Sequence, residues 1–340
     1  MKQKTIFYFA PLEGITGYTF RNVHHHYYEG MDKYFSPFLS PNQHHAVNPK
    51  EKRDILPEHN KGISLVPQIL TNKAELMLAA AKELKQTYGY EEVNLNLGCP
   101  SKTVVTKGKG AGFLADTEKL ERFLEEVFEK ISVAKQEFPN ISIKTRIGME
   151  DVEEFTELLR IYNQYPLSEL IIHPRVQKDF YKNTPHLDVF REAVEHSKHS
   201  LCYNGDICTL EDFIHMKEMF PTIEKIMIGR GLLTNPALVG ELQAYEQCME
   251  QGEMWNGYTI DFYRLKQYHD NLFEKYIEQM SGDTNVLFKM KELWVYLGRM
   301  FPEQERQVKK IKKPNKLIEY EKVTKEFWEI INCNKFEKVR

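Results

Sequence analysis

The chain has few cysteines, no long hydrophobic run and almost no net charge. Its five cysteines are an odd number without the spacing of a disulfide framework, which indicates a reducing compartment. No segment approaches the ~18 consecutive apolar residues of a membrane span. The 46 Lys and Arg residues nearly balance 49 Asp and Glu residues, giving a net charge of −3. These features favour a cytoplasmic protein that enters no membrane, and they argue against coating of nucleic acid through bulk charge.

Nucleotide-binding and metal-binding motifs are also scarce. The glycines in the segment 108–112 do not have G-x-G-x-x-G spacing, so a Rossmann dinucleotide domain is not expected. Histidines run together at 24–26 and at 44–45, but no cysteine or carboxylate accompanies them at ligand spacing. We therefore predict no metal site and expect these histidines at the surface.

Short β-rich segments alternate with longer helical patterns over the first two-thirds of the 340 residues. Several are nearly continuous apolar runs, as in parallel strands that are buried on both faces. We predict eight strands, at residues 6–10, 33–37, 65–70, 92–97, 141–146, 169–173, 200–204 and 225–229. Their number and spacing predict an α/β fold of the (β/α)₈ TIM-barrel class, which needs about 250 residues.

The last hundred residues predict helices only. Helical patterns cover residues 235–251, 260–280, 285–300 and 316–331, and no convincing strand follows residue 233. We therefore expect two domains: a TIM-barrel catalytic domain over residues 1–240 and a smaller all-helical domain over residues 241–340.

Polar residues and glycines stand at the carboxyl end of nearly every predicted strand, where TIM-barrel enzymes carry their active sites. They occupy positions 10–14, 68, 96–102, 144–146, 173–175, 204–206 and 229–231. Seven such groups together are hard to explain by core packing. We predict one active site at this end of the barrel.

The last two of these strand ends have the composition of a phosphate site. Their glycines allow backbone N–H groups to approach an anion, with Arg230 as a cation; the alternative is that they only permit tight turns. Lys144, in an apolar strand, and His173 would point into the barrel mouth, where a cation stabilises the reduced ring of a flavin. Gln68 would hydrogen-bond the edge of that ring.

Cys99 differs from the other cysteines in its setting. It stands between Gly98 and Pro100 on a turn after the fourth predicted strand, near Lys102 and Lys107. Free cysteines are usually buried as small hydrophobic side chains, whereas a thiol on a turn beside lysines is available for chemistry. We interpret Cys99 as a general acid that donates a proton to carbon.

Five segments carry a family resemblance: APLEGITGYTFR at 10–21, NLNLGCPSKTVVTKGKGAGFL at 94–114, IKTRIG at 143–148, NGDI at 204–207 and MIGRGLLTNP at 227–236. In this order they resemble the dihydrouridine synthases, FMN-dependent enzymes that reduce uridine in RNA, chiefly tRNA, to 5,6-dihydrouridine. The GCPSK block is the most specific of them. The segment 288–301 is similar, more weakly, to the family's helical RNA-binding domain.

The resemblance implies roles for individual residues. Cys99 would protonate C5 of the uracil, while FMN, reduced by NADPH, delivers hydride to C6. The target base would have to leave its stack to reach the site. The residues implied to hold FMN are Pro11, Leu12, Gln68, Lys144, His173, Asn204, Asp206, Gly229 and Arg230. Those implied to contact the RNA are Asn96, Lys102, Arg146 and Arg175.

The sequence departs from the family pattern after His173. The segment 174–176 is Pro-Arg-Val where the family usually has Gly-Arg-Thr. Proline lacks the backbone N–H, so a backbone contact to the cofactor at Pro174 would be absent. Lys109 stands where a glycine is usual and adds positive charge near the substrate loop. We interpret the chain as a divergent but active enzyme.

Positive charge collects near the C-terminus. Residues 306–340 hold 11 Lys and Arg against 5 Asp and Glu, a local net charge of +6, so the remainder carries −9. The densest cluster is Lys309, Lys310, Lys312 and Lys313. An acidic barrel with a basic tail is expected where one domain binds phosphates and the other performs the chemistry; a solvated helix face is the alternative. We predict that these lysines bind tRNA.

Other functions fit parts of the sequence. The same chemistry on ribosomal RNA would use the same residues. A flavin oxidoreductase of a small pyrimidine-like molecule would explain the FMN residues but not the basic helical region. A non-catalytic RNA-binding factor with a relic flavin site conflicts with the intact Cys99. For the oligomeric state, a monomer is the expectation.

Overall fold

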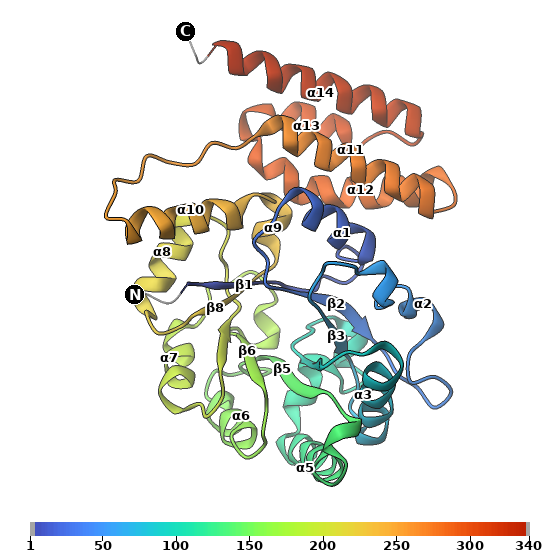
Figure 1. Ribbon diagram of the computed structural model, residues 1–340, viewed down its shortest axis with the longest axis vertical. Coiled ribbons are helices and arrows are strands. Elements are labelled where there is room, and N and C mark those ends of the chain that lie inside the picture. Colours follow the sequence, from blue (N-terminus) through green and yellow to red (C-terminus); the bar gives the residue numbers. More distant parts are fainter. Residues whose placement is uncertain (1–3, 338–340) are drawn as a thin grey trace.

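Eight short strands, each with most of its residues buried, form a closed parallel barrel in this computed structural model (Figure 1). The structure describes residues 4–337, and the side chains of residues 4–331. The strands are β1 Ile6–Phe9, β2 Lys33–Leu39, β3 Leu65–Ile69, β4 Glu92–Leu97, β5 Asn140–Arg146, β6 Glu169–His173, β7 Leu201–Tyr203 and β8 Lys225–Ile228. Pairing of β1 with both β2 and β8 closes the barrel. The predicted TIM-barrel class is confirmed, and each strand end lies within two residues of its expected position.

Helices follow most strands, and local sequence explains where several of them begin and end. Asp116 accepts a hydrogen bond from the N–H of Lys119 at the start of α5. Thr209 and Asp212 form a capping box at the start of α8. Gly89, with φ 75°, ends α3. The helices around the barrel are α1 Tyr18–Tyr27, α2 Pro49–Lys52, α3 Ala74–Tyr88, α4 Lys102–Val105, α5 Thr117–Val133, α6 Glu154–Tyr162, α7 Leu187–His196, α8 Leu210–Met219 and α9 Arg230–Thr234.

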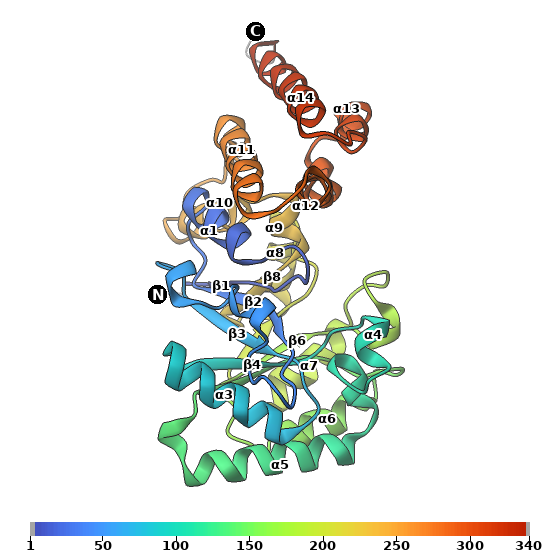
Figure 2. The same cartoon turned by 90° about the vertical axis from the view of Figure 1, so that its right-hand side faces the viewer.

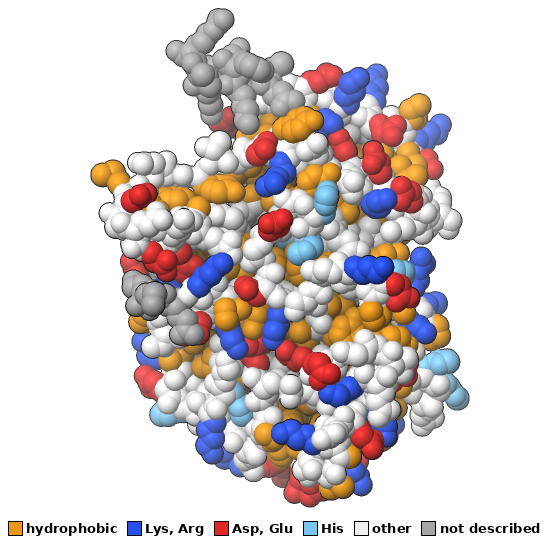
Figure 3. All heavy atoms as spheres, viewed as in Figure 1, with side chains coloured by type: hydrophobic (Ala, Val, Ile, Leu, Met, Phe, Trp, Pro, Cys, Tyr) orange, Lys and Arg blue, Asp and Glu red, His pale blue; other side chains and the backbone are white. Residues whose placement is uncertain are grey.

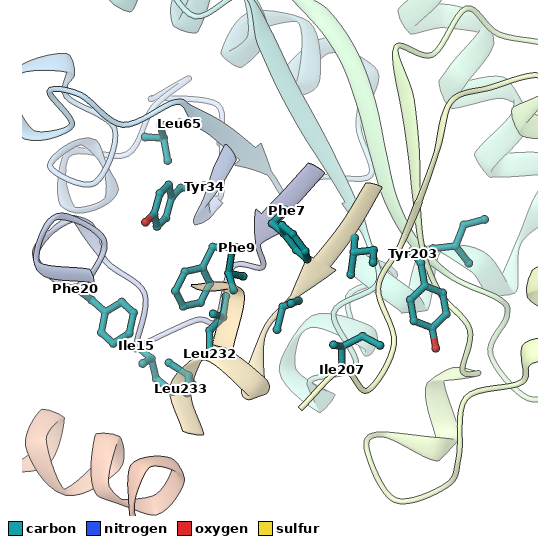
Figure 4. Packing of buried hydrophobic residues seen from close by; sticks show 14 of the residues in the cluster. Phe7, Phe9, Ile15, Phe20, Tyr34, Leu65, Tyr203, Ile207, Leu232 and Leu233 are labelled. Atoms are coloured by element: carbon teal, nitrogen blue, oxygen red, sulfur yellow. The ribbon is translucent and has the colours of Figure 1, made fainter. Parts of the chain in front are cut away.

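Side chains of β1 alternate between two apolar cores. Phe7 and Phe9 point outward to the helices, and the ring of Phe9 contacts that of Phe20 in α1 at 5.8 Å between centroids (Figure 4). Tyr8 points inward, where it packs on Phe35 of β2. This period of two follows from the strand geometry, and it fills the barrel interior so that the barrel is a packed core beneath its open end.

The C-terminal region is helical, as predicted, and lies beyond α1 and α9 (Figures 1 and 2). Its helices are α10 Leu238–Glu250, α11 Phe262–Gln279, α12 Asp283–Leu297, α13 Glu305–Ile311 and α14 Leu317–Glu337. The core of this region centres on Trp294, whose indole N–H donates to the Tyr320 hydroxyl at 2.9 Å. The expected boundary between residues 240 and 241 falls inside α10, which packs on α8. None of the described helices combines the length and hydrophobicity of a membrane span.

An aromatic cluster joins the helical region to the barrel. Tyr268 of α11 is fully buried. Its ring packs against Phe20 and His24 of α1 and against Tyr28, the residue that follows this helix. His24 Nδ1 lies 3.0 Å from the Tyr34 hydroxyl. Burial lowers the pKa of His24 to about 3, so its ring is neutral. The expectation of a surface position is therefore wrong for His24, because docking of α11 covers that face of α1.

Replacing Tyr268 with Phe should stabilise the protein. The Tyr268 hydroxyl is buried and has no hydrogen-bond partner among the described residues, and an unsatisfied buried polar group costs about 1–3 kcal/mol. We expect Tyr268→Phe to raise the free energy of unfolding by about 1 kcal/mol in urea titrations. Tyr320→Phe is the matched control: it removes a hydroxyl bonded to both His269 and Trp294, and it should destabilise. Equal effects of the two changes would contradict this assignment.

Candidate active site

Hydrogen bonds and ring contacts join side chains from six strand ends at the carboxyl end of the barrel. Among the residues expected from the sequence, the structure brings together Gln68, Asn96, Cys99, Lys144, Arg146, His173, Arg175, Asp206 and Arg230. Pro11, Leu12, Asn204 and Gly229 lie on the adjoining ends of β1, β7 and β8. The clustering of these groups follows from the barrel, whose parallel strands all end on one side.

A chain of hydrogen bonds runs through the barrel interior toward this site. Ser142 donates to Glu92 Oε1 at 2.9 Å, and Asn94 donates to Ser142 Oγ at 3.0 Å. Gln68 Nε2 then donates to Asn94 Oδ1 at 2.8 Å, and Asn96 Nδ2 donates to Gln68 Oε1 at 2.7 Å. The Gln68 amide keeps one N–H and one lone pair for a ligand.

Sequence reasoning missed the lower members of this chain. Glu92, Asn94 and Asn96 alternate with apolar residues in β4. That period of two in an otherwise buried strand indicates a polar stripe inside the barrel, and it is the signal that would have revealed Asn94.

Asn96 fixes the turn that carries Cys99. Its Oδ1 accepts the N–H of Gly98 at 3.0 Å and that of Cys99 at 2.9 Å. The carbonyl of Gly98 in turn accepts a hydrogen bond from Arg146 Nε at 3.0 Å, and the carbonyl of Cys99 accepts the N–H of Ala111 at 3.1 Å. The thiol is therefore mounted on a turn with few free backbone groups.

The environment keeps the Cys99 thiol protonated. Burial raises its pKa, and the carboxylate of Glu13 raises it further, whereas the Ser101 N–H and the charges of Lys144 and Arg146 act in the opposite direction. The net rise leaves a neutral, half-buried thiol at physiological pH. This is the protonation state that a general acid requires.

Arg146 connects the Cys99 turn to the loop after β6. Besides Gly98, its guanidinium donates to the carbonyls of Val176 and Phe180, each at 2.8 Å. The side chain is 1% exposed and lies over the Tyr181 ring at 5.5 Å. Three of its five N–H donors are thereby engaged by backbone carbonyls, and the Tyr181 side chain is a further hydrogen-bond partner.

A second network links β6, β7 and β8. A tight turn closes at Pro174, where the Arg175 N–H donates to the His173 carbonyl at 2.7 Å. The buried Arg175 guanidinium then lies 3.0 Å from both His173 Nε2 and Asp206 Oδ1. Asp206 also accepts from Arg230 at 2.5 Å. Arg175, which the resemblance assigned to RNA contact, is thus enclosed by the protein.

This network sets the protonation of two groups. A guanidinium can only donate, so Nε2 of His173 accepts and the neutral ring carries its proton on Nδ1. Burial, with the charges of Arg146 and Lys144, holds the pKa of His173 well below its usual range. Burial works against the charge of Asp206, but hydrogen bonds from Arg175 and the charges of Arg175 and Arg230 lower its pKa.

Lys144 is the cation left for a ligand. It is half-buried and makes no hydrogen bond or ion pair with any residue that the structure describes. Burial, helped by the charge of Arg146, lowers its pKa to about 8. A desolvated ammonium group without a partner suits an electron-rich or anionic ligand atom, such as the N1–C2=O edge of a flavin.

The predicted phosphate pocket is partly explained by packing. A Cβ on Gly205 would lie 1.9 Å from the Tyr203 hydroxyl, and one on Gly231 would lie 2.2 Å from the Ile207 carbonyl. Tight packing therefore requires both glycines. The N–H groups of Arg230 and Gly231, at the start of α9, donate to no other described group, which fits a phosphate. Asn204 donates to the Met227 carbonyl at 2.8 Å.

The remaining expected residues lie outside this cluster. Lys102 is exposed in α4, and Lys309, Lys310, Lys312 and Lys313 are exposed at the end of α13 and just after it. α4 and α13 lie on the same side of the molecule (Figure 2, right). On the face seen in Figure 3, acidic and basic side chains are intermingled and no large area carries one sign.

A cleft of about 500 Å³ separates the β1–α1 loop from the helical region. Its lining includes Glu13, Arg53, Tyr276 and Lys289. Lys289 of α12 donates to the carbonyl of Gly14, which holds the two parts together at this point. Because the charge of Glu13 also raises the pKa of the Cys99 thiol, the cleft adjoins the Cys99 turn.

A packed eight-stranded barrel with polar groups gathered at its carboxyl ends defines a TIM-barrel enzyme. The family model described as "Dihydrouridine synthase (Dus)" matches residues 8–328. The chain belongs to the dihydrouridine synthase family.

Individual relatives agree with this assignment. The chain is 28% identical over 236 residues to "tRNA-dihydrouridine synthase B" of Pasteurella multocida, covering 69% of this chain and 68% of that protein. It is 28% identical over 299 residues to a "Probable tRNA-dihydrouridine synthase" of Staphylococcus epidermidis, covering 86% and 85%. The barrel is also similar to a solved 2-naphthoyl-CoA reductase, with TM-score 0.52, 11% identity and coverage of 73% and 50%. That last likeness shows the fold alone.

Alkylation of Cys99 should report its raised pKa. The thiolate is the nucleophile in alkylation. We therefore expect the rate at which iodoacetamide modifies Cys99 to rise with pH, with a midpoint above the ~8.5 of a free thiol. Mass spectrometry of the peptide that contains Cys99 measures this rate. Glu13→Gln removes a negative charge and should lower the midpoint, whereas Lys144→Met removes a positive charge and should raise it. A midpoint near pH 7 would contradict the assignment of a neutral thiol.

Proposed function

We propose that this protein reduces uridines in tRNA to 5,6-dihydrouridine, with FMN as cofactor and NADPH as electron donor. The observation that carries the proposal is the position of the half-buried Cys99 thiol on a turn fixed by Asn96 and Arg146, beside the unpartnered Lys144. The family assignment supports the reaction, since relatives named as tRNA-dihydrouridine synthases cover most of the chain.

The residues at the barrel mouth fit FMN. Lys144, the free Nδ1–H of His173 and the spare N–H of Gln68 would bind its ring, and Pro11 and Leu12 would pack against it. The N–H groups at the start of α9, with Arg230, Gly229, Asn204 and Asp206 around them, would hold its phosphate side. When bound, FMN supplies the hydride for C6 of the uracil.

The chain supplies the proton and the orientation. Cys99 would transfer its thiol proton to C5, so that one hydride and one proton together saturate the C5=C6 bond. Asn96 and Arg146 hold the Cys99 turn in place, and an N–H group of Arg146 that no backbone carbonyl uses would bind a uracil oxygen. The thiolate left behind would recover a proton from water, because its pKa is raised.

The division of labour extends along the chain. We assign catalysis to residues 1–240 and RNA binding to residues 241–340, together with Lys102 at the barrel rim. The exposed lysines at the end of α13 and just after it lie on the side of the molecule that also carries α4 (Figure 2). This arrangement favours RNA over a free pyrimidine as substrate, because a small molecule would need no distant cations.

Removal of the Cys99 thiol should abolish the reaction without releasing flavin. General acid catalysis contributes about 10²–10⁴-fold, so we expect Cys99→Ala to form dihydrouridine in unmodified tRNA at least 100 times more slowly. Flavin absorbance of the purified protein should be retained. Cys248→Ala, a half-buried cysteine in α10, is the control and should be fully active. Full activity of Cys99→Ala would refute the acid assignment.

Charge reversal of the four lysines near α13 should weaken tRNA binding. We expect a variant with Glu at all four positions, Lys309, Lys310, Lys312 and Lys313, to bind tRNA more weakly. Its log Kd should also depend less steeply on log salt concentration, because each lost phosphate contact removes about 0.7–0.9 from the slope. Glu substitution of Lys85, Lys130, Lys135 and Lys198, at the carboxyl ends of the outer helices or just beyond them, is the matched control. An unchanged affinity and slope in the first variant would exclude this surface.

A further inference from the structure

Phe180 has an unusual backbone conformation. Its φ is 51° and its ψ is −97°, and it is the single non-glycine residue with positive φ among those the structure describes. A bulky L-residue is strained in this region, because its Cβ approaches the backbone. Such strain persists only where the surroundings impose it, and it concentrates at functional sites.

Hydrogen bonds on both sides of Phe180 impose this conformation. Arg146 Nη2 donates to its carbonyl at 2.8 Å, and its own N–H donates to the Gln177 carbonyl at 3.1 Å. Asp179, just before it, is buried and accepts the N–H of Val176 at 3.2 Å. The loop is therefore held at its backbone, independently of the Phe180 side chain.

The Phe180 ring is left in solvent. It is 44% exposed and makes no ring or cation contact with any described side chain. The neighbouring Tyr181 differs: guanidinium groups of Arg230 and Arg146 lie 4.4 and 5.5 Å from its ring centre. Phe180 thus offers a free aromatic face beside a tyrosine whose ring is already occupied by two cations.

Phe180 lies close to the catalytic turn. The guanidinium of Arg146 that holds its carbonyl also bonds the carbonyl of Gly98. The same loop is tied to this turn a second time, since Gln177 Nε2 donates to the Pro100 carbonyl at 3.1 Å. The exposed ring therefore stands on a loop anchored directly to the turn that carries Cys99.

We propose that Phe180 is a stacking platform for a nucleobase of the RNA next to the uridine that enters the site. This inference rests on the proposed function and deepens it. An enzyme that extrudes a base leaves an unstacked neighbour in the RNA, and an exposed aromatic ring is the side chain that stacks on such a base without regard to sequence. The surrounding Arg146 and Arg230 supply the positive potential that the adjoining phosphates require.

Substitutions at Phe180 separate strain from stacking. Phe180→Gly removes both the strain and the ring, so it should melt at a higher temperature than the native protein while binding unmodified tRNA about tenfold more weakly. Phe180→Ala keeps the strained backbone but lacks the ring, and it should lose the same affinity without the gain in melting temperature. Phe180→Tyr restores an aromatic face and should bind within twofold of the native protein, whereas Phe180→Leu should not.

The controls make the outcome decisive. Val133→Ala, at the exposed end of α5, should leave the Kd for tRNA unchanged. If the native protein forms dihydrouridine and all four Phe180 variants bind tRNA like it, the stacking role is overturned and the proposed function stands. If the native protein forms none but Phe180→Gly and Phe180→Ala still bind tRNA more weakly, the proposed function fails and the stacking role stands. Equal loss in Phe180→Tyr and Phe180→Gly would also overturn stacking.

Discussion

The site depends on one constraint, which is that polar groups inside a packed barrel must find partners. An unsatisfied buried donor or acceptor costs about 1–3 kcal/mol, and Glu92, Ser142, Asn94, Gln68 and Asn96 avoid that cost by bonding to one another in series. This series of hydrogen bonds ends at Asn96, whose side-chain oxygen accepts the N–H groups of Gly98 and Cys99. Because each amide is oriented by the one below it, the position of the thiol is set by the barrel core rather than by the loop itself.

The side chains at the barrel mouth carry more positive than negative charge. Lys144, Arg146, Arg175 and Arg230 come together there, and Asp206 is the carboxylate that bonds to two of them. Burial, together with these positive charges, keeps His173 neutral. The neutral ring can then accept a hydrogen bond from Arg175 at Nε2. The site thus holds a protonated thiol and a neutral imidazole within an excess of positive charge, which favours electron-rich ligands and phosphates.

Features set by local pattern could be predicted from the sequence, and features set by docking could not. Apolar runs located all eight strands, and the Gly-Cys-Pro turn singled out Cys99. The burial of His24 was missed because α11, far along the chain, covers it. The bond between Arg175 and His173 depends on the turn at Pro174. The sequence at Pro174 indicates only the loss of a backbone N–H, so it does not predict this turn. α13 was missed because seven residues carry too little periodicity.

The helical region contacts the barrel next to the candidate active site. Tyr268 and its aromatic neighbours fix α11 on α1, and Lys289 of α12 bonds the carbonyl of Gly14 directly after the strand end that carries Pro11 and Leu12. The β1–α1 loop therefore contacts both the barrel mouth and the helical region. The cleft lined by Glu13 and Lys289 lies between the two parts. The near-neutral net charge of the chain is compatible with RNA binding, because local clusters of exposed cations, such as the lysines at the end of α13, can contact phosphates without a large net charge.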